Sequence, residues 1–276
     1  MPTIAVSTFS FGPEGMAREG MDFALEHGFK GLELGSWNHW PDLMSPEDVK
    51  YLRVQAATQG IELSIHFIHR GVAPATHVPE RRAKHLGELR QTLRLAGDIG
   101  ARVIVVHPGP LDYPGVGAAD TSEEVRQEAI GNLQSFLEEA LPAAEDAGAV
   151  LCLENLTHAP GDVFQSYSDL RGVVEAINHP LLKIILDVGH ADRSDGLREA
   201  FDAFGPYIRH IHAHDSTGQR DHLEIGKAQL DFSKFLDVLK PFPYTLAMES
   251  RDESDPQGCV LRSRDVLAEA LGEAAR

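Results

Sequence analysis

The sequence has 276 residues and a formal net charge of −17; 42% of the residues are hydrophobic and 24% are charged. This composition is ordinary for a globular protein and suits one large α/β domain. The excess of 42 acidic over 25 basic residues disfavours nucleic acid and anionic membranes as partners. No apolar run approaches the length of a membrane span, the start "MPTIAVSTFSFGPEG" lacks a signal-peptide pattern, and two cysteines indicate no disulfide framework. We therefore expect a cytoplasmic protein with no membrane partner.

Short runs of β-branched and apolar residues predict eight strands. They cover residues 3–7, 31–35, 62–66, 102–107, 150–154, 183–187, 208–212 and 244–249. Amphipathic helical segments lie between these runs. One is predicted to stop at Gly60, another to stop at Gly100, and a third to begin with Thr121 or Ser122 as its cap.

Strands that alternate with helices pair in parallel, and eight such units close naturally into a barrel. We therefore predict an α/β fold, a single (β/α)8 TIM barrel domain over residues 1–276. An open, doubly wound sheet is the alternative. Its dinucleotide-binding signature is missing, because "GVGAAD" at 115–120 follows a Pro-rich loop and not a strand. The loop 107–120 is expected at the rim of the site.

Most of the predicted strands end in a side chain that can bind a metal. These residues are His66, His107, Glu154, Asp187, His212 and Glu249. Since all strand carboxyl ends open onto one face of a barrel, the six are expected to share one pocket and to bind a divalent cation there. One such residue alone more simply caps a helix, as Asp187 could, or faces a loop, as Glu33 could, although Glu33 could also face the mouth of the barrel. Six together would each need a buried polar partner, and a shared metal supplies one.

The segment "YIRHIHAHD" places His210, His212 and His214 at alternate positions, so all three point to the same side of the seventh strand. His212 stands at the strand's end, His210 is expected one layer lower, and His214 lies past the end. Sequence motifs of other chemistries are missing: there is no GxSxG elbow, no GxxxxGK[ST] loop and no HExxH helix.

The segments "LSIHF", "VIVVHPG", "LCLENL", "ILDVGHAD", "IRHIHAHDSTG", "RDHLEIGKAQLDF" and "LAMES" resemble the strand ends of the xylose isomerase-like TIM barrels. That superfamily includes sugar and sugar-phosphate isomerases and epimerases, and the endonuclease IV type of abasic-site nuclease, also called AP endonuclease family 2. The resemblance covers nearly the whole chain. It is specific for the superfamily and not for one activity.

The epimerase branch implies one divalent metal held by Glu154, Asp187, His212 and Glu249, with both glutamates also serving as acid and base. The resemblance further implies that Asn155 orients the neighbouring carboxylate. Residues assigned to a second metal or to substrate are His66, His107, His190 and His222. Residues assigned to substrate alone are Trp37, His214 and Arg251, with Trp40 and Arg70 as further candidates.

The nuclease branch implies up to three zinc ions, and the same four histidines, His66, His107, His190 and His222, stand at ligand-like positions. These nucleases place an Asp two residues before the last of those histidines. Here that position holds Arg220, and Asp221 is shifted by one. The negative net charge and the lack of basic loops also disfavour DNA as the substrate.

We accordingly predict a metal-dependent sugar or sugar-phosphate isomerase or epimerase of carbohydrate metabolism that works by proton transfer through a metal-stabilised enediolate. Its partner is a small sugar-like substrate, its cofactor is Mn²⁺, Zn²⁺, Co²⁺ or Mg²⁺, and a homo-oligomer is compatible with the sequence. The alternatives are an endonuclease IV-type multi-zinc phosphodiesterase, a metal-dependent dehydratase or lyase on a small hydroxy compound, and a non-catalytic barrel that binds a sugar or metal as a sensor.

Overall fold

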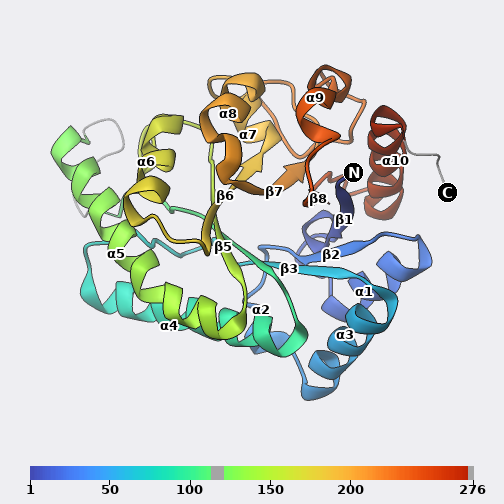
Figure 1. The fold of residues 1–276 in the computed structure, drawn as a ribbon, viewed down its shortest axis with the longest axis horizontal. Helices are drawn as coiled ribbons and strands as arrows, with labels where there is room; N and C mark the ends of the chain where they lie inside the picture. Colours follow the sequence, from blue (N-terminus) through green and yellow to red (C-terminus); the bar gives the residue numbers. More distant parts are fainter. Residues whose placement is uncertain (113–120, 273–276) are drawn as a thin grey trace.

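A computed structural model describes residues 1–112 and 121–272 of the chain. Within these residues, eight parallel strands form a closed barrel in sequential order, β1-β2-β3-β4-β5-β6-β7-β8, and helices surround it (Figure 1). The predicted (β/α)8 TIM barrel is therefore confirmed, and the open sheet is excluded. The motif at 115–120 lies outside the described residues.

The strands of the barrel agree closely with those predicted. They are β1 (Thr3–Ser7), β2 (Gly31–Leu34), β3 (Glu62–His66), β4 (Val103–Val106), β5 (Val150–Glu154), β6 (Leu182–Asp187), β7 (Ile208–Ala213) and β8 (Thr245–Met248). No boundary differs from its prediction by more than one residue. The difference matters at two strand ends, because His107 and Glu249 follow β4 and β8 and are not their last residues.

Helices connect successive strands on the outside of the barrel. They are α1 (Ala17–Glu26), α2 (Trp40–Leu43), α3 (Pro46–Gln59), α4 (Pro79–Ile99), α5 (Glu123–Ala147), α6 (Tyr167–Ile177), α7 (Val188–Asp192), α8 (Leu197–Phe204), α9 (Leu236–Leu239) and α10 (Pro256–Leu271), with the 3-10 helices η1 (Thr8–Phe11), η3 (Gly205–Tyr207) and η4 (Phe232–Phe235). Gly60 and Gly100 end α3 and α4 in the left-handed conformation that favours glycine, as predicted. Ser122, and not Thr121, caps α5.

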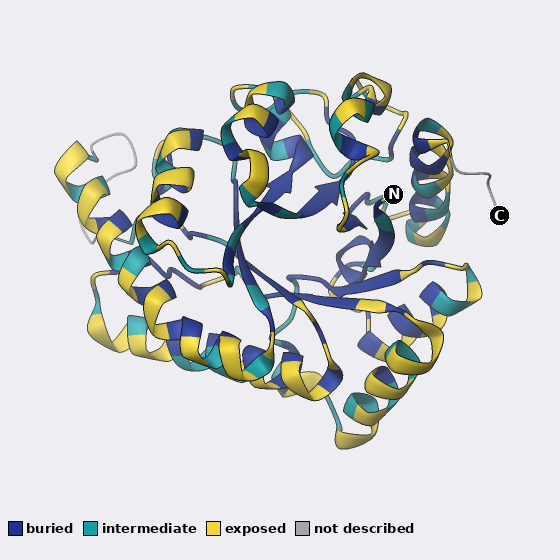
Figure 2. Cartoon of the chain, viewed as in Figure 1, coloured by how far each residue is buried: buried dark blue, intermediate teal, exposed yellow. Residues whose placement is uncertain are grey.

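The strands are buried on both faces, and the exposed residues lie on the outer faces of the helices (Figure 2). The main hydrophobic cluster fills the space between strands and helices. A second, smaller cluster comes from β4, β5 and β6 and consists of Val103, Val105, Cys152 and Ile185. Val103 and Val105 alternate with residues of the main cluster, so this second cluster lies inside the barrel.

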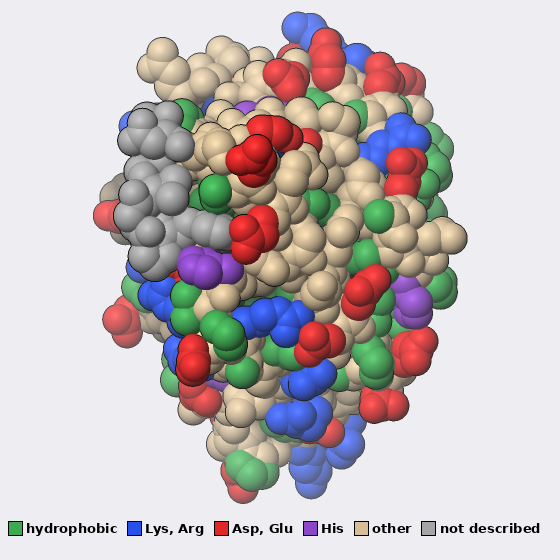
Figure 3. Space-filling view, turned by 90° about the vertical axis from the view of Figure 1, so that its left-hand side faces the viewer, with side chains coloured by type: hydrophobic (Ala, Val, Ile, Leu, Met, Phe, Trp, Pro, Cys, Tyr) green, Lys and Arg blue, Asp and Glu red, His purple; other side chains and the backbone are tan. Residues whose placement is uncertain are grey.

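No described helix is long and apolar enough to cross a membrane. The face seen in Figure 3 carries both acidic and basic side chains. Ion pairs between surface helices include that of Arg82 on α4 with Glu139 on α5, at 2.9 Å.

The connection from β7 to β8 is built around one buried carboxylate, that of Asp215. Its two oxygens accept hydrogen bonds of 2.8–2.9 Å from the backbone N–H groups of Ser216, Gly226, Ala228 and Leu230. The Asp215 backbone also pairs with Leu223 in both directions. A loop with little secondary structure is thereby given a fixed shape, and this loop carries His222 over the open end of the barrel.

We predict that Asp215→Ala lowers the free energy of unfolding by about 3 kcal/mol or more, because it leaves several backbone N–H groups without their acceptor. Urea denaturation measures this change. Asp146→Ala, on the exposed face of α5, is the control and should change stability by less than about 0.5 kcal/mol. Equal stabilities of the two variants would contradict the role given to Asp215.

Candidate metal centre and active site

The four residues implied as ligands of one metal converge at the open end of the barrel, and all four are buried. Three carboxylate oxygens surround the Nδ1 atom of His212. Oε2 of Glu249 lies 3.3 Å from that nitrogen, Oε1 of Glu154 lies 3.5 Å away, and Oδ2 of Asp187 lies 3.7 Å away. The strand ends therefore bring these predicted residues together.

Ligand atoms of Glu154, Asp187 and His212 lie within 4.8 Å of one another and could share a cation, and Glu249 adds an oxygen 3.3 Å from His212 Nδ1. Ligand atoms roughly 2.1 Å from a tetrahedrally coordinated ion are roughly 3.4 Å from one another. His212 Nδ1 has no hydrogen-bond partner among the described residues, although three anionic groups surround it. Buried polar atoms normally have partners, and a divalent cation at the centre of this group would supply one. The donor set therefore fits a divalent metal.

A second group consists of His66, His107 and Glu154. Oε2 of Glu154 lies 3.2 Å from His66 Nε2 and 3.0 Å from His107 Nε2, yet it has no hydrogen bond within the described residues. His66 Nδ1 lies 2.9 Å from the carbonyl oxygen of Phe67, which can only accept. In neutral His66 the proton is therefore on Nδ1, so the lone pair of Nε2 faces an anionic oxygen. This arrangement also fits a cation between the two atoms.

A third group consists of Asp187, His190 and His222. His190 Nδ1 lies 3.0 Å from the carbonyl oxygen of Asn155, and His222 Nδ1 lies 3.3 Å from that of Glu249. Each ring thus donates to a carbonyl and leaves Nε2 free. His222 also has a left-handed backbone with φ of 54°, which is uncommon for a side chain of this size and indicates a position held by its surroundings.

Arg220 and Asp221, where the sequence departs from the nuclease pattern, are not arranged as metal ligands. Asp221 forms an ion pair with Arg193, and its nearest oxygen is 3.9 Å from His190 Nε2. Arg220 lines the mouth of the barrel. Asp221 is therefore engaged by a guanidinium and is not part of the third group.

Asp187 is held by several neighbours. Its Oδ1 accepts from the backbone N–H of His190 at 2.7 Å, so it also caps α7, which was the simpler reading of this residue. His214 Nε2 lies 2.9 Å from Oδ2. The Asn155 amide bonds to the backbone of Asp187 in both directions, at 2.8 and 3.0 Å. Asn155 thus orients the residue on the next strand and not its own neighbour, Glu154.

His214 is fully buried, and both ring nitrogens have protein partners. Nδ1 accepts from the backbone N–H of His222 at 2.9 Å, so Nε2 carries the proton that faces Asp187. A Cβ at Gly189 would lie 2.2 Å from His214 Cε1, which explains why a glycine stands beside this ring. In this arrangement His214 positions Asp187 and has no nitrogen left for a substrate.

The pKa values of Glu154 and Glu249 are shifted in opposite directions. Burial raises the pKa of Glu249, and although His212 lowers it, Glu33 and Glu154 add to the rise, so the pKa lies well above its usual value. Burial also raises the pKa of Glu154, but His107 and His212 outweigh this effect and hold it well below its usual value. Without a cation, Glu249 therefore keeps its proton to a higher pH than an ordinary glutamate, and Glu154 stays ionised to a lower pH.

The mouth of the barrel opens into a cavity of about 810 Å³, lined by Phe9, Gln219, Arg220, Asp221, His222, Leu223, Glu224, Lys227, Arg251, Asp252 and Glu253. Trp37 stands near this mouth and stacks on Phe9 with ring centroids 5.0 Å apart. The guanidinium groups of Arg70 and Arg251 lie 4.1 and 4.9 Å from the Trp37 ring centre. Trp40, the first residue of α2, is instead buried, and its indole donates to the Gly35 carbonyl at 2.8 Å.

Sequence reasoning missed one site residue, His69, and left a second, Glu33, undecided. His69 stacks on His107 with centroids 5.0 Å apart, its Nδ1 has no hydrogen-bond partner in the described chain, and burial together with the neighbouring His107 lowers its pKa to about 3. Glu33, for which a loop-facing position and one facing the mouth were both open, is fully buried and contacts His210 and His212. The inward alternation of β2 was the signal that could have found Glu33, and the "HFIH" spacing the one for His69.

Comparison with known proteins places the chain among related barrels. The sequence profile described as "Xylose isomerase-like TIM barrel" matches residues 21–271. An uncharacterised protein of Methanocaldococcus jannaschii is 29% identical over 273 residues, which are 96% of this chain and 88% of that protein. A probable endonuclease 4 of Oleidesulfovibrio alaskensis is 29% identical over 182 residues, which are 59% of this chain and 58% of that protein.

Among solved structures, one described as a D-tagatose 3-epimerase-like protein has a TM-score of 0.81 and 26% identity, covering 98% of this chain and 97% of that chain. The profile match spans most of the sequence, and the closed barrel agrees with it. The chain belongs to the xylose isomerase-like TIM barrel family.

Proposed function

We propose that this protein is a divalent-metal-dependent isomerase or epimerase that acts on a small sugar or sugar phosphate. The observation that carries the proposal is the buried group of three carboxylates, from Glu154, Asp187 and Glu249, around Nδ1 of His212 at 3.3–3.7 Å. The likeness of this protein to a D-tagatose 3-epimerase-like protein, along almost the whole chain, supports the same reaction class.

The reaction class requires that a proton leave a carbon next to a carbonyl and return to the same or a neighbouring carbon. A divalent cation, when bound, supplies Lewis-acid stabilisation of the negative charge that develops on the substrate oxygens. Glu154 and Glu249 come from β5 and from the end of β8, three strands apart around the barrel, and each has an oxygen near the same nitrogen. A substrate carbon held between them can lose its proton to one carboxylate and regain it from the other.

The remaining polar groups of the mouth are suited to substrate binding. His190 and His222 each keep Nε2 free for a hydroxyl or phosphate oxygen. Arg251 lines the cavity beside Trp37 and can bind a polar group of the substrate. Trp37 does not line the cavity itself; it supports the lining residues Phe9 and Arg251, whose side chains contact its ring.

A second candidate function is hydrolysis of a phosphodiester on two or three zinc ions. The observation that favours it is the pair of additional groups, one of His66, His107 and Glu154 and one of Asp187, His190 and His222. The partial similarity to a probable endonuclease 4 points the same way. The lining of the cavity argues against hydrolysis of nucleic acid, because it has more Asp and Glu than Lys and Arg residues. A surface that binds a row of phosphates needs an excess of basic residues.

We predict that Glu154→Gln and Glu249→Gln each slow proton exchange at the substrate carbon by about 10²- to 10⁴-fold, because glutamine keeps the volume and an oxygen but cannot transfer the proton. The measurement is incorporation of deuterium from heavy water into ketoses and their phosphates. Glu138→Gln, exposed on α5, should behave like the unaltered protein. His190→Gln should lose less activity than either glutamate variant. Exchange that survives in both glutamate variants would refute the assignment.

We also predict that a chelator lowers the unfolding temperature and that one equivalent of Mn²⁺ or Co²⁺ per chain restores it. Binding to the folded state at a concentration 100-fold above Kd stabilises it by about 2.7 kcal/mol. Scanning calorimetry combined with titration gives both the stabilisation and the number of ions. Two or three ions per chain, together with incision of a duplex that contains an abasic site, would favour the hydrolase instead.

A further inference from the structure

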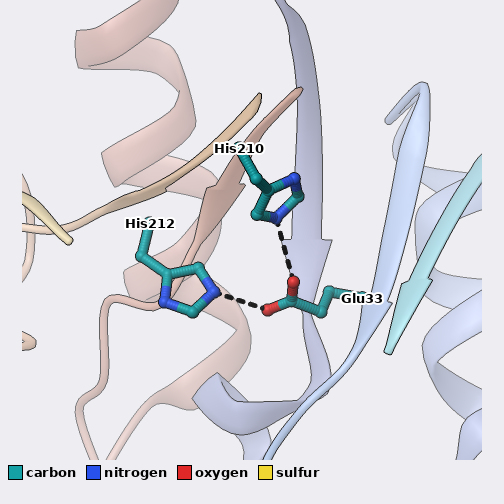
Figure 4. A group of neighbouring side chains, drawn as sticks. All are labelled: Glu33, His210 and His212. Atoms are coloured by element: carbon teal, nitrogen blue, oxygen red, sulfur yellow. Dashed lines mark hydrogen bonds and ion pairs between the residues drawn. The ribbon is translucent and has the colours of Figure 1, made fainter. Parts of the chain in front are cut away.

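A group of three buried polar side chains, Glu33, His210 and His212, includes one residue of the candidate metal centre, His212 (Figure 4). Glu33 on β2 faces His210 and His212 on β7, and all three are fully buried. Oε2 of Glu33 accepts from Ser64 Oγ at 3.0 Å and lies 2.9 Å from His210 Nε2. Oε1 lies 3.1 Å from His212 Nε2. Neither Oε1 nor this nitrogen has a hydrogen-bond partner among the described residues; the contact between them is at ion-pair distance without hydrogen-bond geometry.

The donors around Glu33, and not the distances, set it apart from the candidate ligands. The nitrogen–oxygen separations of 2.9 and 3.1 Å resemble those between Glu154 and the rings of His66 and His107. Oε2 of Glu33, however, already faces two donors, Ser64 Oγ and His210 Nε2. A carboxylate held in this way is placed to accept hydrogen bonds behind His212.

The chemistry of imidazole then links Glu33 to the metal centre. A neutral histidine carries one N–H and one lone pair. If Nδ1 of His212 is the atom that faces the cation, Nε2 must carry the proton, and Glu33 is the acceptor placed to receive it. A carboxylate behind a ligand histidine fixes its tautomer and its ring orientation and makes the ligand nitrogen more basic.

We propose that Glu33, held in place by Ser64 and His210, is the positioning residue that keeps His212 in the Nε2–H tautomer with Nδ1 directed at the cation. This inference rests on the metal site of the proposed function. Glu33 does not reach the substrate cavity, whose lining residues do not include it. Its effect is therefore on the affinity of the metal and on the state of His212.

The test is the affinity of the full-length protein for Co²⁺ and Zn²⁺, measured by competition with a chromophoric chelator. Glu33→Gln should weaken binding about 10- to 100-fold, the usual effect of losing the partner behind a ligand histidine. Glu62→Gln is the matched control. It removes a carboxylate from the start of β3, where Glu62 accepts from Thr245 at 2.7 Å and contacts no candidate ligand. Its affinity should stay within about threefold of the unaltered protein.

A second measurement does not depend on any variant. Nitrogen-15 NMR of the zinc-loaded protein reports which ring nitrogen of His212 carries the proton, and the expected result is Nε2. A proton on Nδ1, or a Glu33→Gln variant that folds and binds metal as tightly as the control, would overturn the inference and leave the proposed function standing. A protein that binds neither ion would overturn the metal site itself.

Discussion

The feature on which the open end of the barrel depends is the cost of burying several carboxylates together. Glu154, Asp187 and Glu249 are almost fully buried around a single imidazole, and Glu33 lies behind it. Like charges at such distances cannot all remain ionised without compensation, which is why the pKa values of Glu154 and Glu249 move in opposite directions. One histidine supplies at most one positive charge. A divalent cation bound there, as proposed, would replace that single charge with two and lower the cost of burying these carboxylates.

The barrel and its loops hold these groups in place by ordinary means. Parallel register brings the end of each strand to the same face. Gly189 leaves room for His214, which contacts Asp187. The carboxylate of Asp215 fixes the loop that carries His222. Each ligand candidate thus has a neighbour that limits its rotation, as a preorganised site requires.

Much of this fold and part of its site could be predicted from the sequence. The strands are short β-branched runs with clear ends, and helices α3 and α4 stop at glycines, Gly60 and Gly100, whose left-handed backbone is a local property. The polar strand ends followed from the same local pattern combined with the geometry of a closed barrel. These parts were accessible because neighbouring residues in the chain determine them.

The rest depended on contacts between distant residues. The position of Glu33 stayed open between a loop and the mouth because its partners, His210 and His212, are far from it in the sequence. The direction of the His214 ring follows from space at Gly189 and from a backbone donor in the next loop. The loop after β7 has no periodic pattern, since its shape comes from one buried carboxylate. Predicting such features requires the register of the barrel strands to be known first.

The central claim is that the group around His212 binds a cation through these four side chains. Anomalous diffraction from crystals soaked in Mn²⁺, collected at the manganese absorption edge, tests it most directly. The account predicts the strongest peak about 2.0–2.3 Å from His212 Nδ1 and from one oxygen each of Glu154, Asp187 and Glu249. A strongest peak between His66 and His107, away from His212, or no peak at this end of the barrel, would contradict it.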